Sequence, residues 1–370
     1  MKISVSLAGL SVTLLTAGLI TGCGDSDSNS GLSSPPGAPS GSAPSVSVFA
    51  GQLNTAGSAG GSLSNAQFDE PMGLAADKSG NIYVADESAE TISKISNGSI
   101  SIFAGTAYQQ GSSDGAGSAA RFEAPQELAI DPSGNLYLTD GVPNSDAATV
   151  RKITPSGQVS TIIDPATGQA LQTNGSVAIA ADAQSNVYIF MTNRSTGAVQ
   201  LTQVTPAGAV NPVTLTSTSA APVLLINPQA LAVDASNNLY ISDDDINGAA
   251  GALYKVSLNG SAGQATLLAG SVVSSGASDG TGALATFNGL DDLAIDSSGN
   301  IYAEDFFNQT IREITPAGVV TTFAGIAGQS ALNLGQLPQP LPSLDGLAII
   351  GSTLYMSAPD NSVVLQIAPL

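Results

Sequence analysis

Six regularly spaced tyrosines constrain the fold more than any other feature of this sequence. Of its eight Tyr residues, six recur at intervals of 54, 51, 52, 62 and 53 residues. They are Tyr83, Tyr137, Tyr188, Tyr240, Tyr302 and Tyr355. A fixed period of about 50 residues indicates a repeat protein in which each unit packs against its neighbours. The sequence therefore predicts six copies of one structural unit.

The residues around each tyrosine predict four short strands per unit. An apolar run such as Leu128-Ala129-Ile130-Asp131 leads to an Asp-x-x-Gly-Asn turn, and the Tyr-bearing strand follows. A third strand such as 150–154 comes next, then a Pro-x-Gly turn and an outer strand such as 319–323. Four-stranded units of this length are typical of blades, so we predict an all-β, six-bladed β-propeller over residues 45–370.

The two ends of this region predict how the ring closes. The last unit stops after its third strand, Val363 to Ile367, and so lacks an outer strand. Residues 45–51 match the outer-strand endings Phe103-Ala104-Gly105 and Phe323-Ala324-Gly325. We expect the first strand to complete the last blade, which would remove an exposed sheet edge.

These repeats resemble the NHL repeat family, whose blades carry similar Leu-Ala-x-Asp, Gly-Asn-x-Tyr and Ile-Arg-Lys-Ile runs. The resemblance spans about 45 to 370, is clear in blades one, two, four and five, and is weakest in blade six, where Ile350 replaces the Asp. It implies the propeller fold, whereas function must be argued from particular sites.

Residues 1–22 predict an export signal that ends in a lipid-attachment site. Lys2 precedes a short apolar run, and Leu19-Ile20-Thr21-Gly22-Cys23 resembles a bacterial lipobox, which implies acylation of Cys23. The alternative is an ordinary secretory signal with an incidental Cys. Residues 23–44, rich in Ser, Gly, Ala and Pro, predict a disordered tether. We thus expect a protein lipid-anchored in a bacterial cell envelope, with Gly24 favouring the outer membrane or the periplasmic face.

Composition excludes several functions. The chain has no His and one Cys, so a Ser-His-Asp triad, a His-ligated zinc site and chemistry like that of His-zinc propeller lyases are excluded. The formal net charge of −20 opposes nucleic-acid binding, which needs a basic patch. No Gly-x-Gly-x-x-Gly segment lies between a strand and a helix, so the sequence gives no support for a nucleotide site.

Acidic residues gather at positions that a propeller brings to one face. Some lie just before the Leu that opens each inner strand: Glu127, Asp291, Asp292 and Asp345. Others follow the tyrosine strand: Asp86, Asp140, Asp243, Asp244, Asp245, Glu304 and Asp305. Carboxylates without His or Cys favour a hard cation, so a Ca²⁺ or Mg²⁺ site formed by Glu127, Asp291, Asp345 and Asp243 is one hypothesis.

Structural roles compete with that hypothesis. Asp86, Asp140, Asp243 and Asp305 each follow their Tyr by three residues and would cap their own turns. The entrance carboxylates would then form an acidic rim without an ion. Two Ser-Asp-Gly segments, 113–117 and 278–282, are either paired calcium loops or turns that seat Phe122 and Phe287 between blades.

Phe306 and Phe307 are an aromatic pair where neighbouring blades are polar. One ring is expected to pack under its blade and the other to anchor a partner, together with Asp244 and Asp245.

Two functions remain. The first is a non-catalytic binding or scaffold module whose acidic face binds a protein or a small envelope ligand. The second is a divalent-metal-dependent hydrolase or lactonase similar to the gluconolactonase propellers, although their Glu-Gly-Pro motif is absent.

Overall fold

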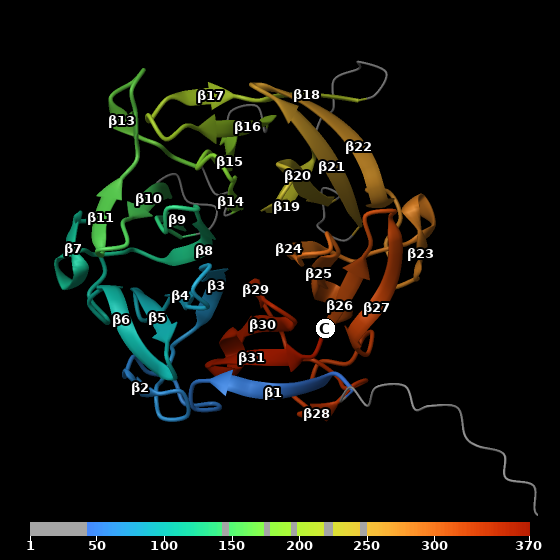
Figure 1. Cartoon of the computed structure of the whole chain (residues 1–370), viewed down its shortest axis with the longest axis horizontal. Helices are drawn as coiled ribbons and strands as arrows, with labels where there is room; N and C mark the ends of the chain where they lie inside the picture. The colour runs from blue at the N-terminus through green and yellow to red at the C-terminus, as the bar shows by residue number, and fades with distance from the viewer. Residues whose placement is uncertain (1–42, 143–147, 174–177, 194–197, 218–224, 245–249) are drawn as a thin grey trace, which may run out of the picture. The chain divides into compact units, whose positions relative to one another are not determined.

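The computed structural model confirms a ring of six β-sheets (Figure 1). It describes residues 43–142, 148–173, 178–193, 198–217, 225–244 and 250–370. Cys23, the residues before it and Asp245 lie outside this part of the chain. Within it, no helix has the length and apolar character needed to cross a membrane.

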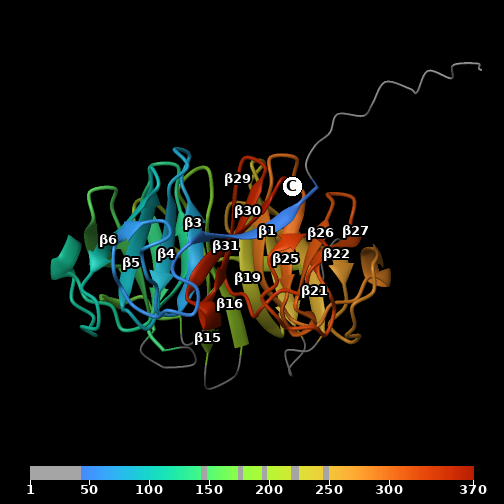
Figure 2. The same ribbon diagram turned by 90° about the horizontal axis from the view of Figure 1, so that it is seen from below.

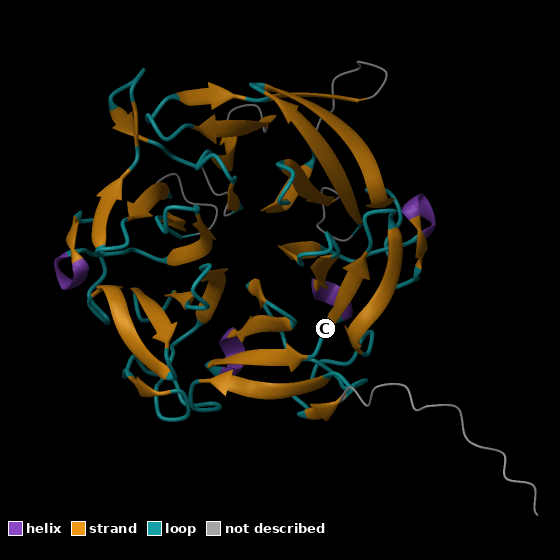
Figure 3. Ribbon diagram, in the orientation of Figure 1, coloured by secondary structure: helices purple, strands orange, loops and turns teal. Residues whose placement is uncertain are grey.

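The four main strands of each blade are antiparallel and follow one another outward from the centre (Figure 3). Blade 1 contains β3 (Pro71–Ala76), β4 (Ile82–Asp86), β5 (Thr91–Ser96) and β6 (Ser99–Gly105). Blade 2 contains β8 (Pro125–Ile130), β9 (Leu136–Asp140), β10 (Thr149–Ile153) and β11 (Gln158–Thr161). Blade 3 contains β14 (Ile179–Ala181), β15 (Val187–Asn193), β16 (Ala198–Val204) and β17 (Val210–Pro212). The four strands predicted per unit are therefore present in the first half of the ring.

The second half repeats the arrangement. Blade 4 contains β19 (Asn227–Val233), β20 (Asn238–Asp244), β21 (Gly251–Asn259) and β22 (Ala262–Gly270). Blade 5 contains β24 (Leu290–Ile295), β25 (Ile301–Asp305), β26 (Thr310–Ile314) and β27 (Val319–Gly325). Blade 6 contains β29 (Leu347–Ile350), β30 (Thr353–Ala358), β31 (Val363–Ala368) and β1 (Ser45–Ala50). A 3₁₀ turn at Phe306–Asn308 joins β25 to β26.

The first strand closes the ring as predicted. β1 pairs antiparallel with β31, from Ser45 opposite Ala368 to Ala50 opposite Val364. In the described part of the chain, five blades also have a short fifth strand on the outside. It is formed by the segment that precedes the inner strand of the same blade. These strands are β2 (Gly61–Ser62), β7 (Gly115–Ala116), β18 (Thr214–Ser217), β23 (Gly280–Thr281) and β28 (Gly335–Gln336). These strands cover sheet edges that would otherwise be open to pairing.

The hydrophobic core lies between the blades rather than at the centre of the ring. Six buried clusters occur, one at each interface between adjacent blades. At the interface of blades 1 and 2, for example, Tyr83 and Ala85 pack with Leu128 and Leu138. Five of the six registered tyrosines are buried in these interfaces and Tyr355 is partly buried there, which explains their regular spacing.

The Asp-x-x-Gly-Asn turns fix the inner hairpins. In blade 2 the Asp131 Oδ1 accepts the backbone N–H groups of Ser133 and Asn135, both at 2.9 Å. Its Oδ2 accepts the Tyr137 hydroxyl at 3.3 Å. These turns lie on one side of the ring, which we call the turn face. We call the opposite side the entrance face. On this side the chain enters the inner strand of each blade and passes from the second strand to the third. The strands run between the two faces (Figure 2).

Candidate functional site

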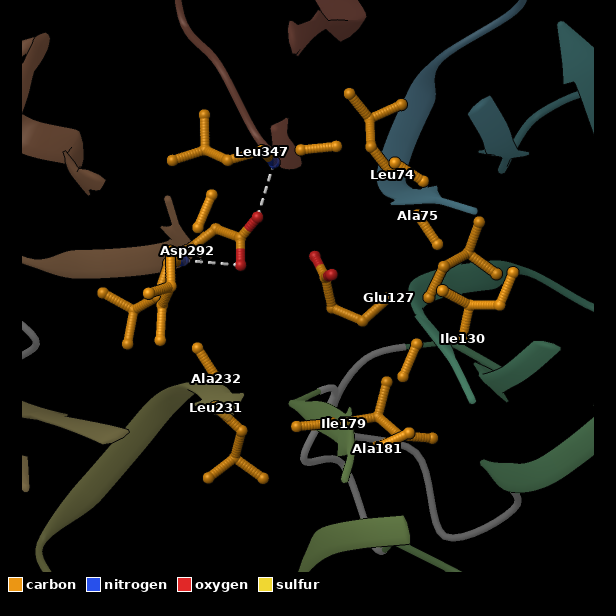
Figure 4. A pocket seen from close by; sticks show the side chains of 18 of the residues that line it. Leu74, Ala75, Glu127, Ile130, Ile179, Ala181, Leu231, Ala232, Asp292 and Leu347 are labelled. Atoms are coloured by element: carbon orange, nitrogen blue, oxygen red, sulfur yellow. Dashed lines mark hydrogen bonds between the residues drawn. The ribbon is translucent and has the colours of Figure 1, made fainter. Parts of the chain in front are cut away.

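Two carboxylates face each other across the central channel at its entrance end. Glu127 comes from β8 of blade 2 and Asp292 from β24 of blade 5, and both side chains point into the same space (Figure 4). In the other blades the equivalent position holds a small residue: Gly73, Ala178, Ala230 and Gly346. Only blades 2 and 5, which lie opposite each other, place an acid there.

A β-bulge in the inner strand aims these side chains. The pairing of β8 with β9 slips between Pro125 and Leu128, and that of β24 with β25 slips between Leu290 and Leu293. The residues in each slip are Gln126 with Glu127, and Asp291 with Asp292. Bulges turn side chains away from the regular alternation of a strand, so the acids reach the channel instead of a blade interface.

Two glycines bring a third acid into this group. A Cβ at Gly73 would lie 2.7 Å from the Glu127 Cα, and a Cβ at Gly346 would lie 2.8 Å from the Gly73 Cα. Only glycine allows backbones to approach so closely, so blades 6, 1 and 2 are packed tightly here. Asp345, next to Gly346, is thereby brought near Glu127, and the charge of Asp345 adds to the burial that raises the pKa of Glu127.

Asp292 links two blades while it faces the channel. Its Oδ1 accepts the Leu293 N–H at 2.7 Å and its Oδ2 accepts the Leu347 N–H of blade 6 at 2.5 Å. Burial raises the pKa of Asp292 to about 7, although both hydrogen bonds favour the ionised form. These two hydrogen bonds fix the orientation of the Asp292 carboxyl group.

The remaining acids of the cluster also hold protons unusually tightly. Burial raises the pKa of Asp345 to about 8, with Asp292 and Asp291 adding repulsion, and burial raises that of Asp291 to about 6. The pKa values of Glu127, which is partly buried, and of the buried Glu304 lie well above the ordinary Glu value, because both carboxyls are desolvated and other carboxylates repel their charge. We call these five residues, Glu127, Asp291, Asp292, Glu304 and Asp345, the channel carboxylates.

The predicted ligands Glu127, Asp291 and Asp345 therefore lie in one cluster, whereas Asp243 does not join it. The Asp243 Oδ1 accepts the backbone N–H groups of Ile226 and Asn227, both at 2.8 Å, where the chain enters β19. Burial raises the pKa of Asp243 to about 6. Across the described residues, no group of three or more Asp, Glu or Cys side chains is arranged to hold a metal ion.

The four Asp residues that were expected to cap their own turns accept hydrogen bonds from residues farther away in the sequence. Each accepts a backbone N–H from the segment that enters its own blade, 17 residues earlier: Asp86 from Asp69, Asp140 from Glu123, Asp243 from Ile226 and Asp305 from Asn288. The expected backbone hydrogen bonds are present, but they join the second strand to the blade entrance.

The two Ser-Asp-Gly segments bind buried arginines. The Asp279 Oδ1 lies 2.9 Å from the Arg312 Nη2, and the Arg312 Nη1 lies 2.7 Å from the Asp305 Oδ2. The Arg312 guanidinium also lies over the Phe287 ring. In blade 2, Asp114, Arg151, Asp140 and Phe122 repeat this arrangement. Of the two hypotheses for these segments, the structure therefore supports the turns that seat the two Phe rings. In each blade the contact is made through a buried arginine that the sequence did not reveal.

The expected partner-binding residues separate. Phe307 is 48% exposed and packs edge-on against the half-buried Phe306 at 5.0 Å between ring centroids. Asp244, by contrast, is 1% exposed, and its Oδ1 accepts the Leu290 N–H of blade 5. The expectation that Asp244 belongs to an exposed binding surface is therefore wrong, because it serves the interface between two blades.

The sequence places Glu304 among the acids of the loops after the tyrosine strands, whereas the structure places it inside a buried strand. It lies in β25 and is 3% exposed, and its pKa is raised by burial and then by the charges of the other channel carboxylates. One sequence signal could have identified Glu304: it lies inside a predicted strand, directly before the repeated Asp305. Buried strands favour apolar residues, so a Glu at this position is unusual.

Comparison with known proteins shows the fold. No family model and no curated protein matches the chain. An auxiliary nutrient binding protein from Bacteroides ovatus ATCC 8483 is 19% identical, with a TM-score of 0.65, over 89% of this chain and 77% of that one. Like it, this chain is a β-propeller.

Two further structures are more distant. A virginiamycin B lyase from Staphylococcus aureus is 14% identical, with a TM-score of 0.51, over 84% of this chain and 98% of that one. A putative gluconolactonase is 16% identical, with a TM-score of 0.52, over 85% and 93%. At such identities the likeness extends to the fold alone.

Proposed function

We propose that this protein is a non-catalytic binding module of the cell envelope, which takes a positively charged ligand at the entrance end of its channel. The observation behind the proposal is that the five channel carboxylates, from blades 2, 5 and 6, are close enough to raise one another's pKa values, with no basic residue of the described part of the chain among the charges that act on them. Mutual repulsion raises the free energy of such a cluster, and a bound cation relieves it.

Composition and comparison both support a binding role. Without His, and with its single Cys at the predicted lipid-attachment site, the chain lacks the commonest general base and a free thiol nucleophile. An auxiliary nutrient binding protein is among the structures with the same fold. The predicted anchor at Cys23 would hold such a module at a membrane surface, where small ligands or partner proteins pass.

The test is a thermal-shift series with cations of different kinds: CaCl₂, MgCl₂, a linear alkylamine and an oligolysine peptide. At 100 times its Kd, a ligand stabilises the folded state by about 2.7 kcal/mol, which corresponds to roughly 4–6 °C in Tm for a domain of this size. We expect at least one cation to raise the Tm of the wild type and to lose this effect in Asp292→Asn. If no cation stabilises the protein, the proposal is wrong.

A metal-dependent hydrolase or lactonase is the second candidate. A putative gluconolactonase shares the fold, and the carboxylates provide the oxygen ligands that Ca²⁺ and Mg²⁺ require. This candidate expects Ca²⁺ or Mg²⁺ to raise the Tm, EDTA to reverse the rise, and a lactone substrate to be hydrolysed with the metal present. Stabilisation by metal without hydrolysis would leave a cation-binding protein only.

A further inference from the structure

One carboxyl oxygen of blade 1 is buried without a hydrogen-bond partner. Asp86, at the end of β4, is 0% exposed; its Oδ1 accepts the Asp69 N–H at 2.9 Å, whereas its Oδ2 accepts no hydrogen bond. Burial raises the pKa of Asp86 well above its ordinary value, although the backbone N–H groups of Asp69 and Ala89 favour the ionised form. A buried acceptor without a donor is rare in folded proteins and requires a physical explanation.

In blades 2 and 5 a buried arginine binds the equivalent oxygen. In blade 5 the Arg312 Nη1 lies 2.7 Å from the Asp305 Oδ2 and donates to the Thr286 carbonyl at 3.0 Å. The Arg312 Nη2 donates to the Ser278 carbonyl at 3.1 Å, and the guanidinium lies over the Phe287 ring. Blade 2 repeats each of these contacts. The site in these two blades is therefore a carboxylate, two carbonyls and a ring face around one guanidinium.

Blade 1 keeps the acceptors of this site. The Gln67 N–H donates to the Ala59 carbonyl at 2.9 Å, the hydrogen bond that also joins the equivalent residues of blades 2 and 5. Phe68 is fully buried and precedes Asp86 by the same number of residues as the Phe precedes the Asp in those two blades. The backbone that presents the two carbonyls, the Phe and the Asp are thus all present in blade 1.

Two residues of blade 1 leave out the cation and its cover. Ser93 pairs with Val84, which is the register position of the arginine in blades 2 and 5. Gly60 directly precedes β2, in the place that Asp114 and Asp279 have before β7 and β23. Those two acids bind the Nη2 atoms from the surface, with side chains that are 48% and 51% exposed. Gly60 is exposed and has no side chain, so this end of the site is uncovered in blade 1.

In the other blades the acid and its partner change together. Blades 3 and 6 have neither the acid nor the arginine, since the two positions hold Met191 with Thr202 and Ala358 with Leu365. In blade 4, which keeps Asp243, Tyr254 occupies the arginine position, and burial and then the charge of Asp243 raise the pKa of Tyr254. Blade 1 is the one that keeps the acid while the residue at the partner position makes no bond to Oδ2.

We propose that the Asp86 site binds a guanidinium group from outside the chain, carried by a small molecule or by an arginine of a partner protein. The group donates to the Asp86 Oδ2 and to the carbonyls of Gln67 and Ala59, stacks on Phe68, and its stem leaves beside Gly60. A guanidinium suits this set because its planar fork donates in several directions and its face stacks on aromatic rings, whereas an ammonium is a compact point charge.

This site is separate from the channel carboxylates. Phe68 belongs to the buried cluster between blades 6 and 1, which also contains Ala348 and Val364 (Figure 1). The inference therefore does not depend on the function proposed above, and either can fail without the other.

The test is isothermal titration calorimetry of the purified protein with guanidinium, butylguanidinium and a short peptide that has one arginine between Gly and Ser residues. Urea has the planar shape without the charge, and butylammonium has the charge without the fork. Each guanidinium compound should bind the wild type at least about tenfold more tightly than these two, because charge-assisted, bidentate hydrogen bonds are the stronger ones. Ligand concentrations stay far below the molar range in which guanidinium unfolds proteins.

Three variants locate the site. Asp86→Asn keeps an acceptor for the Asp69 N–H but removes the charge, so it should weaken binding at least about tenfold. Ser93→Arg should abolish binding and raise the Tm, because it supplies the pair that blades 2 and 5 contain. Asp360→Asn, an exposed acid of blade 6, should leave the affinity unchanged. Thermal melts separate a lost site from a lost fold, and Ser93→Arg serves if Asp86→Asn does not fold.

The outcomes distinguish the sources of the group. Binding of butylguanidinium but not of the peptide supports a small-molecule ligand, and binding of the peptide supports a partner's arginine. Bare guanidinium that binds without either of them would overturn a carried group. Affinity that falls in Asp292→Asn but not in Asp86→Asn would place the cation in the channel and overturn the inference while the proposed function stands. If no guanidinium compound binds the wild type, Asp86 is a neutral buried acid and the inference is wrong.

Discussion

Single residues decide where charge is placed in this propeller, and the sequence revealed only some of them. Glu127, Asp291 and Asp345 could be predicted to converge, because each lies at a known distance from a repeated Leu. The partner of Asp279 could not, because Arg312 is 33 residues away and the two meet only when the blade is formed. The buried position of Asp244 was missed for a related reason: its hydrogen-bond donor, Leu290, belongs to the next blade.

Arg312 provides a residue-scale prediction. Replacement by Met should destabilise the fold by about 3–5 kcal/mol, because it leaves Asp305 buried without its cation. Lys255→Met is the control, since that ammonium lies over the Tyr240 ring and its loss should cost less than about 1 kcal/mol. Urea-induced unfolding followed by tyrosine fluorescence measures both. Equal losses in the two variants would contradict the importance of the buried pair.

At the scale of elements, the repeated turn and the closing strand were predictable because each has a local signature. The Asp-x-x-Gly turn requires positive φ at its fourth position, and Gly80, Gly134 and Gly299 have φ values of 81°, 81° and 85°. The bulges that aim Glu127 and Asp292 were not predictable, since they depend on how each inner strand pairs with its neighbour. Thus the elements followed from the sequence, and the irregularities that form the candidate site did not.

Blade 3 breaks the turn rule in a way that can be tested. Ser185 occupies the glycine position with φ of 62°, a region that costs residues other than glycine roughly 1–2 kcal/mol. We expect Ser185→Gly to stabilise the protein by about 0.5–1 kcal/mol once the greater freedom of glycine in the unfolded chain is subtracted. Gly80→Ser is the reciprocal variant, because nothing lies within 4 Å of a Cβ there, and it should destabilise by a similar amount. Chemical denaturation measures both, and a stabilised Gly80→Ser would refute the strain argument.

At the scale of the whole molecule, the ring and its closure were predicted from the sequence, while the export signal and anchor concern residues outside the described part. The number of blades followed from six tyrosines, because interfaces between identical units repeat the same buried side chain. Which ligand the ring binds could not follow from repetition, because the channel carboxylates are departures from the repeat.

The predicted anchor gives a prediction at this scale. In a bacterial host the wild-type chain should fractionate with membranes and incorporate labelled palmitate, whereas Cys23→Ser should lose the label and move to the soluble fraction. Both forms should have the same Tm, since Cys23 precedes the propeller. Membrane association that persists without the label in Cys23→Ser would show that another segment holds the protein.

The acids and arginines of blades 2 and 5 have a consequence for the symmetry of the ring. Glu127 and Asp292 are 165 residues apart, and so are Asp114 and Asp279, which pair with the buried Arg151 and Arg312. These groups therefore repeat once per three blades rather than once per blade. The backbone is thus a sixfold frame, while its charge has a twofold pattern. Duplication of a three-bladed half would produce such a pattern, and the later divergence of Glu127 from Asp292 leaves a channel whose two walls are no longer equivalent.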